Sequence, residues 1–199
     1  MDLSYIFAHK LVIAFLAGLL SIAYGGFLAY RVLSNPRGDK KMNDIADAIA
    51  EGAAAYMKRQ YTVIAVIGII IFAILYFALG IYSAIGFAIG SIVSSIAGVI
   101  GMTIAVRSNI RTAQAAKKGL PSAFSLAFNG GAVTGFMVAG LALLSVTTFY
   151  WFLERYDPNN LQPLIALGFG GSLISVFARL GGGIFTKSAD VGTDMVGKI

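Results

Sequence analysis

The most constraining feature of this sequence is a series of long apolar runs separated by short polar segments. Hydrophobic residues make up 58% of the 199 residues, whereas charged residues make up only 12%. A helix needs about 20 consecutive apolar residues to cross a bilayer, and soluble domains are far less apolar than this chain. The sequence therefore predicts an all-α, polytopic transmembrane helix bundle. Cysteine is absent, which excludes disulfides and Cys-ligated metal or redox sites.

Five of the apolar runs are long enough to span a membrane. They are predicted at about residues 11–33, 61–79, 84–106, 122–152 and 161–178. The first run is longer than the apolar part of a signal peptide, and no small-residue cleavage site follows it. We therefore expect this run to be retained as a membrane span. The whole chain is expected to form a single membrane domain.

Small residues recur every four positions in two of these spans. In the span at 84–106 they are Gly86, Gly90, Ser94 and Gly98, and in the span at 122–152 they are Gly131, Gly135 and Ala139. Ridges of small residues let helix backbones approach one another closely. Both ridges are therefore expected to be packing surfaces between helices.

The polar segment between the first two spans has the pattern of an amphipathic helix at about residues 43–59. Asn43 or Asp44 is suited to cap its start, and Lys58 and Arg59 suit the negative end of the helix dipole. One stripe of it is apolar: Met42, Ile45, Ile49, Ala53 and Tyr56. We expect a cytoplasmic amphipathic helix that lies across the end of the bundle.

The basic residues are distributed unevenly between the two sides of the predicted bundle. Thirteen of the fifteen Lys and Arg residues follow the first, third and fifth spans, and only Lys10 and Arg155 lie on the other side. By the positive-inside rule, the N-terminus lies outside the cell and the C-terminal tail in the cytoplasm. The chain is thus expected to be a multi-pass protein of the cell membrane. Topology also accounts for the net charge of +6, so no nucleic-acid partner is expected.

The tail at 179–199 carries an ordered set of charges. On a helix with Lys187 at zero, Lys198 falls at about 20°, Asp194 at about 340°, Asp190 at about 300° and Arg179 at about 280°. The two aspartates, about 6 Å apart along the axis, can share one divalent cation, and the lysines can hold a polyanion against it. A solvated face with an Asp194–Lys198 ion pair explains the same spacing. Spacing alone leaves both interpretations open.

The exact string of the tail adds a further indication. From Gly181 to Lys198 it reads Gly-Gly-Gly-Ile-Phe-Thr-Lys-Ser-Ala-Asp-Val-Gly-Thr-Asp-Met-Val-Gly-Lys. This string closely resembles the signature of membrane-bound, ion-pumping inorganic pyrophosphatases. The rest of the chain is similar to the N-terminal part of that family in the order of its spans and the character of its loops. The resemblance implies that this chain is an N-terminal fragment, with five of about sixteen spans, of a protein that acts as a homodimer.

The resemblance also implies a role for each charged residue of the tail. Asp190 and Asp194 match family residues that bind the Mg²⁺ ions of the substrate, and Lys187 and Lys198 match lysines of the substrate site. Arg179 matches an arginine below the site, where hydrolysis is coupled to ion movement. No catalytic residue is assigned, because the family's water-activating residues and remaining Mg²⁺ carboxylates lie on later helices. The isolated chain is therefore expected to be inactive.

The same resemblance implies that the tail continues as a helix through the glycines at 181–183, where the residues alone suggest a break. The expected function is hydrolysis of pyrophosphate, with Mg²⁺, to drive transport of H⁺ or Na⁺ across the lipid bilayer. The choice between H⁺ and Na⁺ stays open, as does activation by K⁺. The alternatives are a non-enzymatic membrane scaffold and a carrier with a cytoplasmic magnesium-sensing helix. Neither alternative requires Lys187, Asp190, Asp194 and Lys198 at these spacings along one helix.

Overall fold

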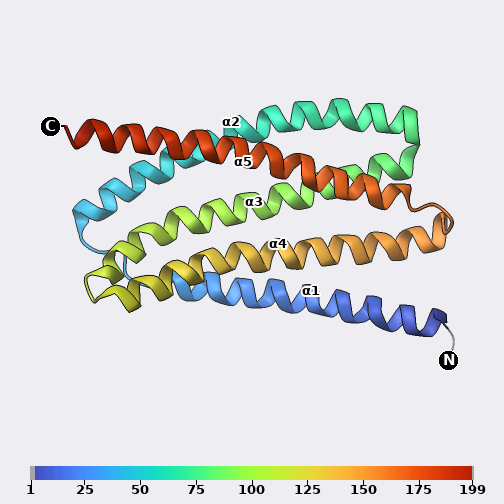
Figure 1. The fold of residues 1–199 in the computed structure, drawn as a ribbon, viewed down its shortest axis with the longest axis horizontal. Coiled ribbons are helices and arrows are strands. Elements are labelled where there is room, and N and C mark those ends of the chain that lie inside the picture. The colour runs from blue at the N-terminus through green and yellow to red at the C-terminus, as the bar shows by residue number, and fades with distance from the viewer. Residues whose placement is uncertain (1–2, 199) are drawn as a thin grey trace.

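The structure, a computed structural model, describes residues 3–198, and for residues 3–8 and 181 it describes the backbone only. The described chain is a bundle of five helices: α1 (Leu3–Leu33), α2 (Lys40–Leu79), α3 (Ile81–Ala116), α4 (Leu120–Tyr156) and α5 (Gln162–Val196) (Figure 1). All five are long and apolar enough to cross a membrane. The predicted all-α, multi-pass class is thus confirmed.

The helices run alternately in opposite directions along the bundle (Figure 1). The α1–α2 and α3–α4 connections and the end of α5 lie together at one end, which we call the basic end. The start of α1 and the α2–α3 and α4–α5 connections lie at the other end. The polar segments rich in Lys and Arg therefore share one end, which is the arrangement that the positive-inside rule requires of a single cytoplasmic side.

Helix α3 is the centre of the bundle and contacts all four other helices. Its glycines allow α5 to come close, because a Cβ on Gly86 would overlap the Pro163 carbonyl and a Cβ on Gly90 would overlap the Leu167 carbonyl. Gly170 of α5 is in equally tight contact with the backbone of Phe87. The small-residue ridge predicted in the third span is thus confirmed as a packing surface.

The ridge predicted in the fourth span is not a packing surface in the described chain. Gly131 and Gly135 are exposed, and a Cβ on either would meet nothing within 4 Å. Instead, Gly130 packs against Ser108 of α3, and Gly140 packs against α1 at Gly18. Within the described chain, the buried face of α4 is set by its partners α1 and α3, and it does not include this ridge.

Helix α2 joins two segments that the sequence analysis separates. The predicted amphipathic helix at 43–59 and the span at 61–79 form one helix of 40 residues, about 60 Å long and twice the thickness of the hydrocarbon core. No Gly or Pro interrupts residues 58–62, and the Thr62 hydroxyl donates to the Lys58 carbonyl at 2.7 Å. The amphipathic segment is thus an extension of the span, and its N-cap is Asp39 rather than Asn43 or Asp44.

The turn between α2 and α3 is a single residue, Gly80. Its φ of 85° lies in the left-handed region that glycine adopts without steric cost. The second and third spans therefore form a tight hairpin, and α3 begins at Ile81, before the predicted start of the third span at 84.

Candidate functional site on helix α5

The signature segment is the second half of α5. This helix of 35 residues runs without a break from Gln162 to Val196 and includes the three glycines at 181–183. The helical continuation that the family resemblance implied is thus confirmed, and the break suggested by the residues alone is wrong. The first half of α5 packs against α3, and the second half extends to the basic end of the bundle (Figure 1).

All the predicted site residues lie on the surface of this segment. Arg179, Lys187, Asp190 and Asp194 are on α5 and are exposed. Lys198 follows the C-cap residue Gly197, whose φ of −70° and ψ of −10° keep the chain close to the helical path. Because α5 is continuous, Asp190 and Asp194 lie one turn apart on the same face.

The charges of this face are not paired with one another. Within the described residues, the side-chain ion pairs are Arg37–Asp47 and Lys117–Asp39, so the alternative Asp194–Lys198 pair is not formed. The hydroxyls of the neighbouring residues are occupied, since Thr186, Ser188 and Thr193 each donate to a carbonyl of α5 one turn back. The unpaired carboxylates and ammonium groups are therefore the groups available to a ligand.

The carboxylates fit a hard cation but supply only part of its shell. Mg²⁺ takes six oxygen ligands in octahedral geometry and is usually held by one or two carboxylates, waters and substrate phosphates. Among the described residues, no group of three or more His, Cys, Asp or Glu residues is suited to hold a metal. The space around the segment is open within the described chain, since a Cβ on Gly182, Gly183 or Gly192 would meet nothing within 4 Å. A complete site needs ligands from outside this part of the chain.

Two contacts from α2 hold the part of α5 that contains Arg179. The side-chain amide of Gln60 donates a hydrogen bond to the Phe177 carbonyl. The ring of Tyr56 lies 5.7 Å from that of Phe185. These contacts lie on either side of Arg179 along α5. These contacts were not predicted from the sequence, although the place of Tyr56 on the apolar stripe indicated that this face of α2 is a packing surface.

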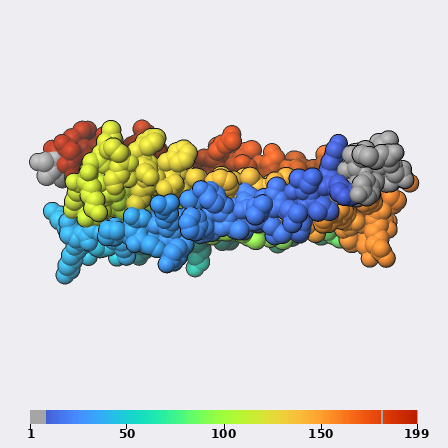
Figure 2. All heavy atoms as spheres, turned by 90° about the horizontal axis from the view of Figure 1, so that it is seen from below, coloured from blue at the N-terminus to red at the C-terminus, as the bar shows by residue number. Residues whose placement is uncertain are grey.

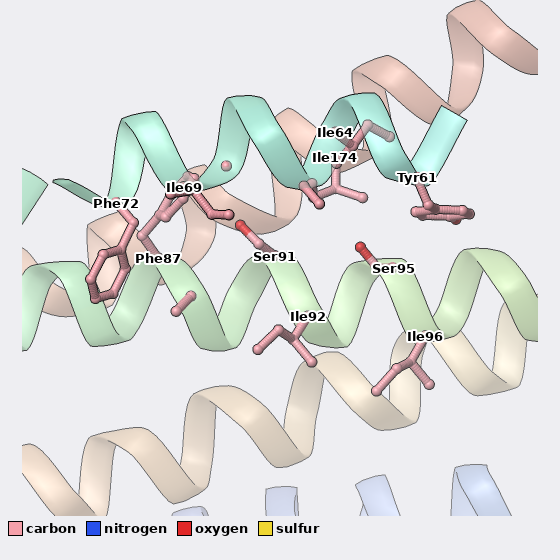
Figure 3. A pocket seen from close by; sticks show the side chains of 13 residues that line it. Tyr61, Ile64, Ile69, Phe72, Phe87, Ser91, Ile92, Ser95, Ile96 and Ile174 are labelled. Atoms are coloured by element: carbon pink, nitrogen blue, oxygen red, sulfur yellow. The ribbon is translucent and has the colours of Figure 1, made fainter. Parts of the chain in front are cut away.

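A groove of about 390 Å³ between α2 and α3 is unsuited to the expected substrate (Figure 3). Its lining is almost entirely apolar, and its polar side chains are those of Tyr61, Ser91 and Ser95. It holds no carboxylate, lysine or arginine that could bind Mg²⁺ or neutralise a polyanion. The candidate site is therefore the charged face of α5.

Comparison with known proteins agrees with the signature. The model of the family described as inorganic H⁺ pyrophosphatase matches residues 19–199. The K(+)-insensitive pyrophosphate-energized proton pump of Methanosarcina mazei is 52% identical over 186 residues, which cover 92% of this chain and 27% of that protein. The K(+)-insensitive pyrophosphate-energized proton pump 2 of Moorella thermoacetica is 42% identical over 185 residues, which cover 92% of this chain and 27% of that protein.

A third relative, the K(+)-insensitive pyrophosphate-energized proton pump of Pyrobaculum aerophilum, is 40% identical over 190 residues, covering 92% of this chain and 26% of that protein. The chain thus spans about a quarter of the length of these relatives. The family match begins inside α1 and includes all of α2 to α5. This chain belongs to the inorganic H⁺ pyrophosphatase family.

Proposed function

We propose that this chain is the N-terminal membrane part of a pump that hydrolyses inorganic pyrophosphate and uses the energy to move protons across the cell membrane. The observation that carries the proposal is the family match over residues 19–199. The relatives are named proton pumps, which favours H⁺ over Na⁺. They are also named K(+)-insensitive, so we expect full activity without K⁺.

The charged face of α5 is proposed to bind the substrate. Pyrophosphate carries several negative charges, and hydrolysis requires that cations surround the phosphoryl groups. Asp190 and Asp194, exposed one turn apart, are the proposed ligands for Mg²⁺, which when bound neutralises phosphate charge. Lys187 and Lys198 are proposed to add positive point charges to the phosphate oxygens. The unpaired state of these groups in the structure supports this assignment.

Arg179 is proposed to couple hydrolysis to ion movement. It lies on α5 where the predicted fifth span ends, so it connects the water-exposed face with the membrane part of the same continuous helix. An arginine at membrane depth is costly unless it is paired or hydrated. A charge of this kind can respond to events at the substrate site and alter the energy of a proton nearby.

The basic end of the bundle is proposed to face the cytoplasm, with the N-terminus outside. The distribution of Lys and Arg supports this orientation. The candidate site would then meet pyrophosphate where metabolism releases it. We further propose that the complete protein acts as a homodimer, as the family resemblance implies.

The test is a transport assay on the complete protein in sealed vesicles. Addition of pyrophosphate and Mg²⁺ to the side exposing the basic end is expected to give phosphate release and proton movement into the vesicles, at the same rate in K⁺ and in choline. Absence of both activities in folded protein would reject the pump in favour of a scaffold or carrier. Phosphate release that requires K⁺ or Na⁺ would reject the proposed ion dependence.

A further inference from the structure

The basic end of the bundle contains a cavity that the proposed pumping function does not use. It has a volume of about 400 Å³ and lies between the end of α1, the first turns of α2 and the end of α3. Its charged lining consists of Arg37, Asp47, Arg107 and Arg111. Figure 2 shows this end of the molecule, where the start of α2 (light blue) lies near the α3–α4 connection (yellow-green). No residue of α5 lines the cavity, so it is separate from the candidate pyrophosphate site.

One arginine of the cavity is held in place by backbone carbonyls. The Nε of Arg111 donates to the carbonyls of Leu33 and Asn35 at 3.2 and 3.1 Å, its Nη2 to Leu33 at 3.0 Å, and its Nη1 to Arg107 at 2.6 Å. These bonds use three of the five guanidinium N–H groups, one on each nitrogen. Two N–H groups of a fixed guanidinium therefore remain for another acceptor.

The cavity has more positive than negative charge. The single carboxylate of its lining, on Asp47, is paired with Arg37. Arg107 is exposed and forms no ion pair within the described residues. Arg37 and Arg107 are also close enough to repel the charge of Arg111. An anion in the cavity would relieve this repulsion and satisfy the remaining donors.

The position of the cavity along the bundle indicates where such an anion would come from. Leu33 and Val106, which line the cavity, are the last residues of the first and third predicted membrane spans. The α1 and α3 sides of the cavity thus lie at the membrane boundary, and its α2 side, Ala46, Asp47 and Ala50, lies beyond the predicted second span on the water side. Basic pockets between helices at this depth suit the phosphate of an anionic lipid.

We propose that this cavity binds a phosphate group, held by Arg107 and Arg111 with help from Arg37, and that its source is the headgroup of an anionic phospholipid. Planar guanidinium groups bind phosphate oxygens through paired N–H donors. The apolar lining receives the glycerol region of the lipid, which free phosphate lacks. The bound lipid joins the ends of α1 and α3 to the start of α2.

The test measures binding of phosphatidylglycerol and of phosphatidylcholine to the complete protein by native mass spectrometry. Arg107→Gln is expected to weaken phosphatidylglycerol binding about tenfold or more, because a charge-assisted contact is lost. Asp47→Asn is expected to strengthen it several-fold, because the only carboxylate of the lining is neutralised and Arg37 is released. This opposite effect cannot come from simple destabilisation.

The matched controls are Arg31→Gln and Asp44→Asn. They make the same charge changes at exposed positions of α1 and α2 outside the cavity, and binding is expected to be unchanged. A second arm measures binding of inorganic phosphate to lipid-free protein in neutral detergent by calorimetry. If the Arg107 and Asp47 variants change the affinity for inorganic phosphate but not for phosphatidylglycerol, the cavity is a phosphate site whose ligand is a soluble phosphate and not a lipid. If neither ligand distinguishes these variants from their controls, the proposal is wrong.

Discussion

Gln60 of α2 donates its side-chain amide to the backbone carbonyl of Phe177 in α5, two residues before Arg179. This bond joins the residue just before the second predicted span to the end of the fifth predicted span. It sets the position of the helix whose outer half carries the candidate site. A shift of α5 along its axis would therefore strain this bond or displace α2 as well.

Replacement of Arg179 tests the proposed coupling. Arg179→Gln in the complete protein is expected to reduce the number of protons moved per pyrophosphate hydrolysed, or the rate of turnover, without loss of pyrophosphate binding. The reason is that the side chain lies below the candidate site rather than in it. Proton uptake and phosphate release are measured in the same vesicles. Arg155→Gln, which replaces an exposed arginine at the opposite end of the bundle, is the control. If Arg179→Gln has the same ratio and the same rate as this control, the assignment is contradicted.

The candidate metal ligands are tested by removal of one carboxylate at a time. Asp190→Ala or Asp194→Ala is expected to lower Mg²⁺-dependent hydrolysis at least about 100-fold, since the phosphate charge is no longer neutralised. Both residues are exposed, so membrane insertion and thermal stability are expected to stay unchanged. Asp44→Ala, which removes an exposed carboxylate of α2, is the control. Normal turnover in either variant would show that its carboxylate does not bind the metal.

The close contact between α3 and α5 predicts which glycines tolerate alanine. Gly90→Ala forces a methyl group into the Leu167 carbonyl, and overpacking of this kind costs about 1–3 kcal/mol. Gly131→Ala places the same methyl group in open space, and the higher helix propensity of alanine makes it neutral or stabilising by up to about 1 kcal/mol. Thermal unfolding of the two variants in detergent makes the comparison. Equal melting temperatures would contradict the described packing.

The N-cap of α2 predicts a dependence of stability on pH. The backbone N–H of Met42, and then the ammonium group of Lys117, donate to the carboxylate of Asp39 and hold its pKa below the ordinary value. A group whose pKa is lowered by folding stabilises the fold above its unfolded pKa, about 4. This contribution is lost as the pH falls through the lowered folded value. Asp39→Asn is thus expected to have a lower melting temperature than the wild type at pH 6, and the difference is expected to shrink toward pH 3.

Much of the helical architecture could be predicted because it depends on local properties. Apolar runs of sufficient length must be helical in a bilayer, since their backbone groups have no other partners there. The uneven distribution of Lys and Arg predicted that the α1–α2 connection, the α3–α4 connection and the tail share one end. The ordered charges of the tail indicated the candidate site, which stays a prediction because the described residues alone do not complete a metal site.

Other features depend on partners that no local pattern specifies. Spacing favoured Gly131 and Gly135 as contact residues, but α1 and α3 contact Gly130 and Gly140 instead. The absence of a helix break near Arg59 merged two predicted segments into α2. The approach of Arg37 to Arg107 and Arg111, which lie far from it in sequence, arises only where the end of α1, the start of α2 and the end of α3 meet.

The apolar runs, the charge asymmetry and the signature string therefore determined the class, the span order and the family of this protein, because each is set by residues adjacent in the chain. The rotation of each helix, the α2–α5 contact beside Arg179 and the arginine cavity were decided by tertiary structure. The physical reason is that a helix presents several faces of similar apolarity, and close fit with a neighbour selects among them.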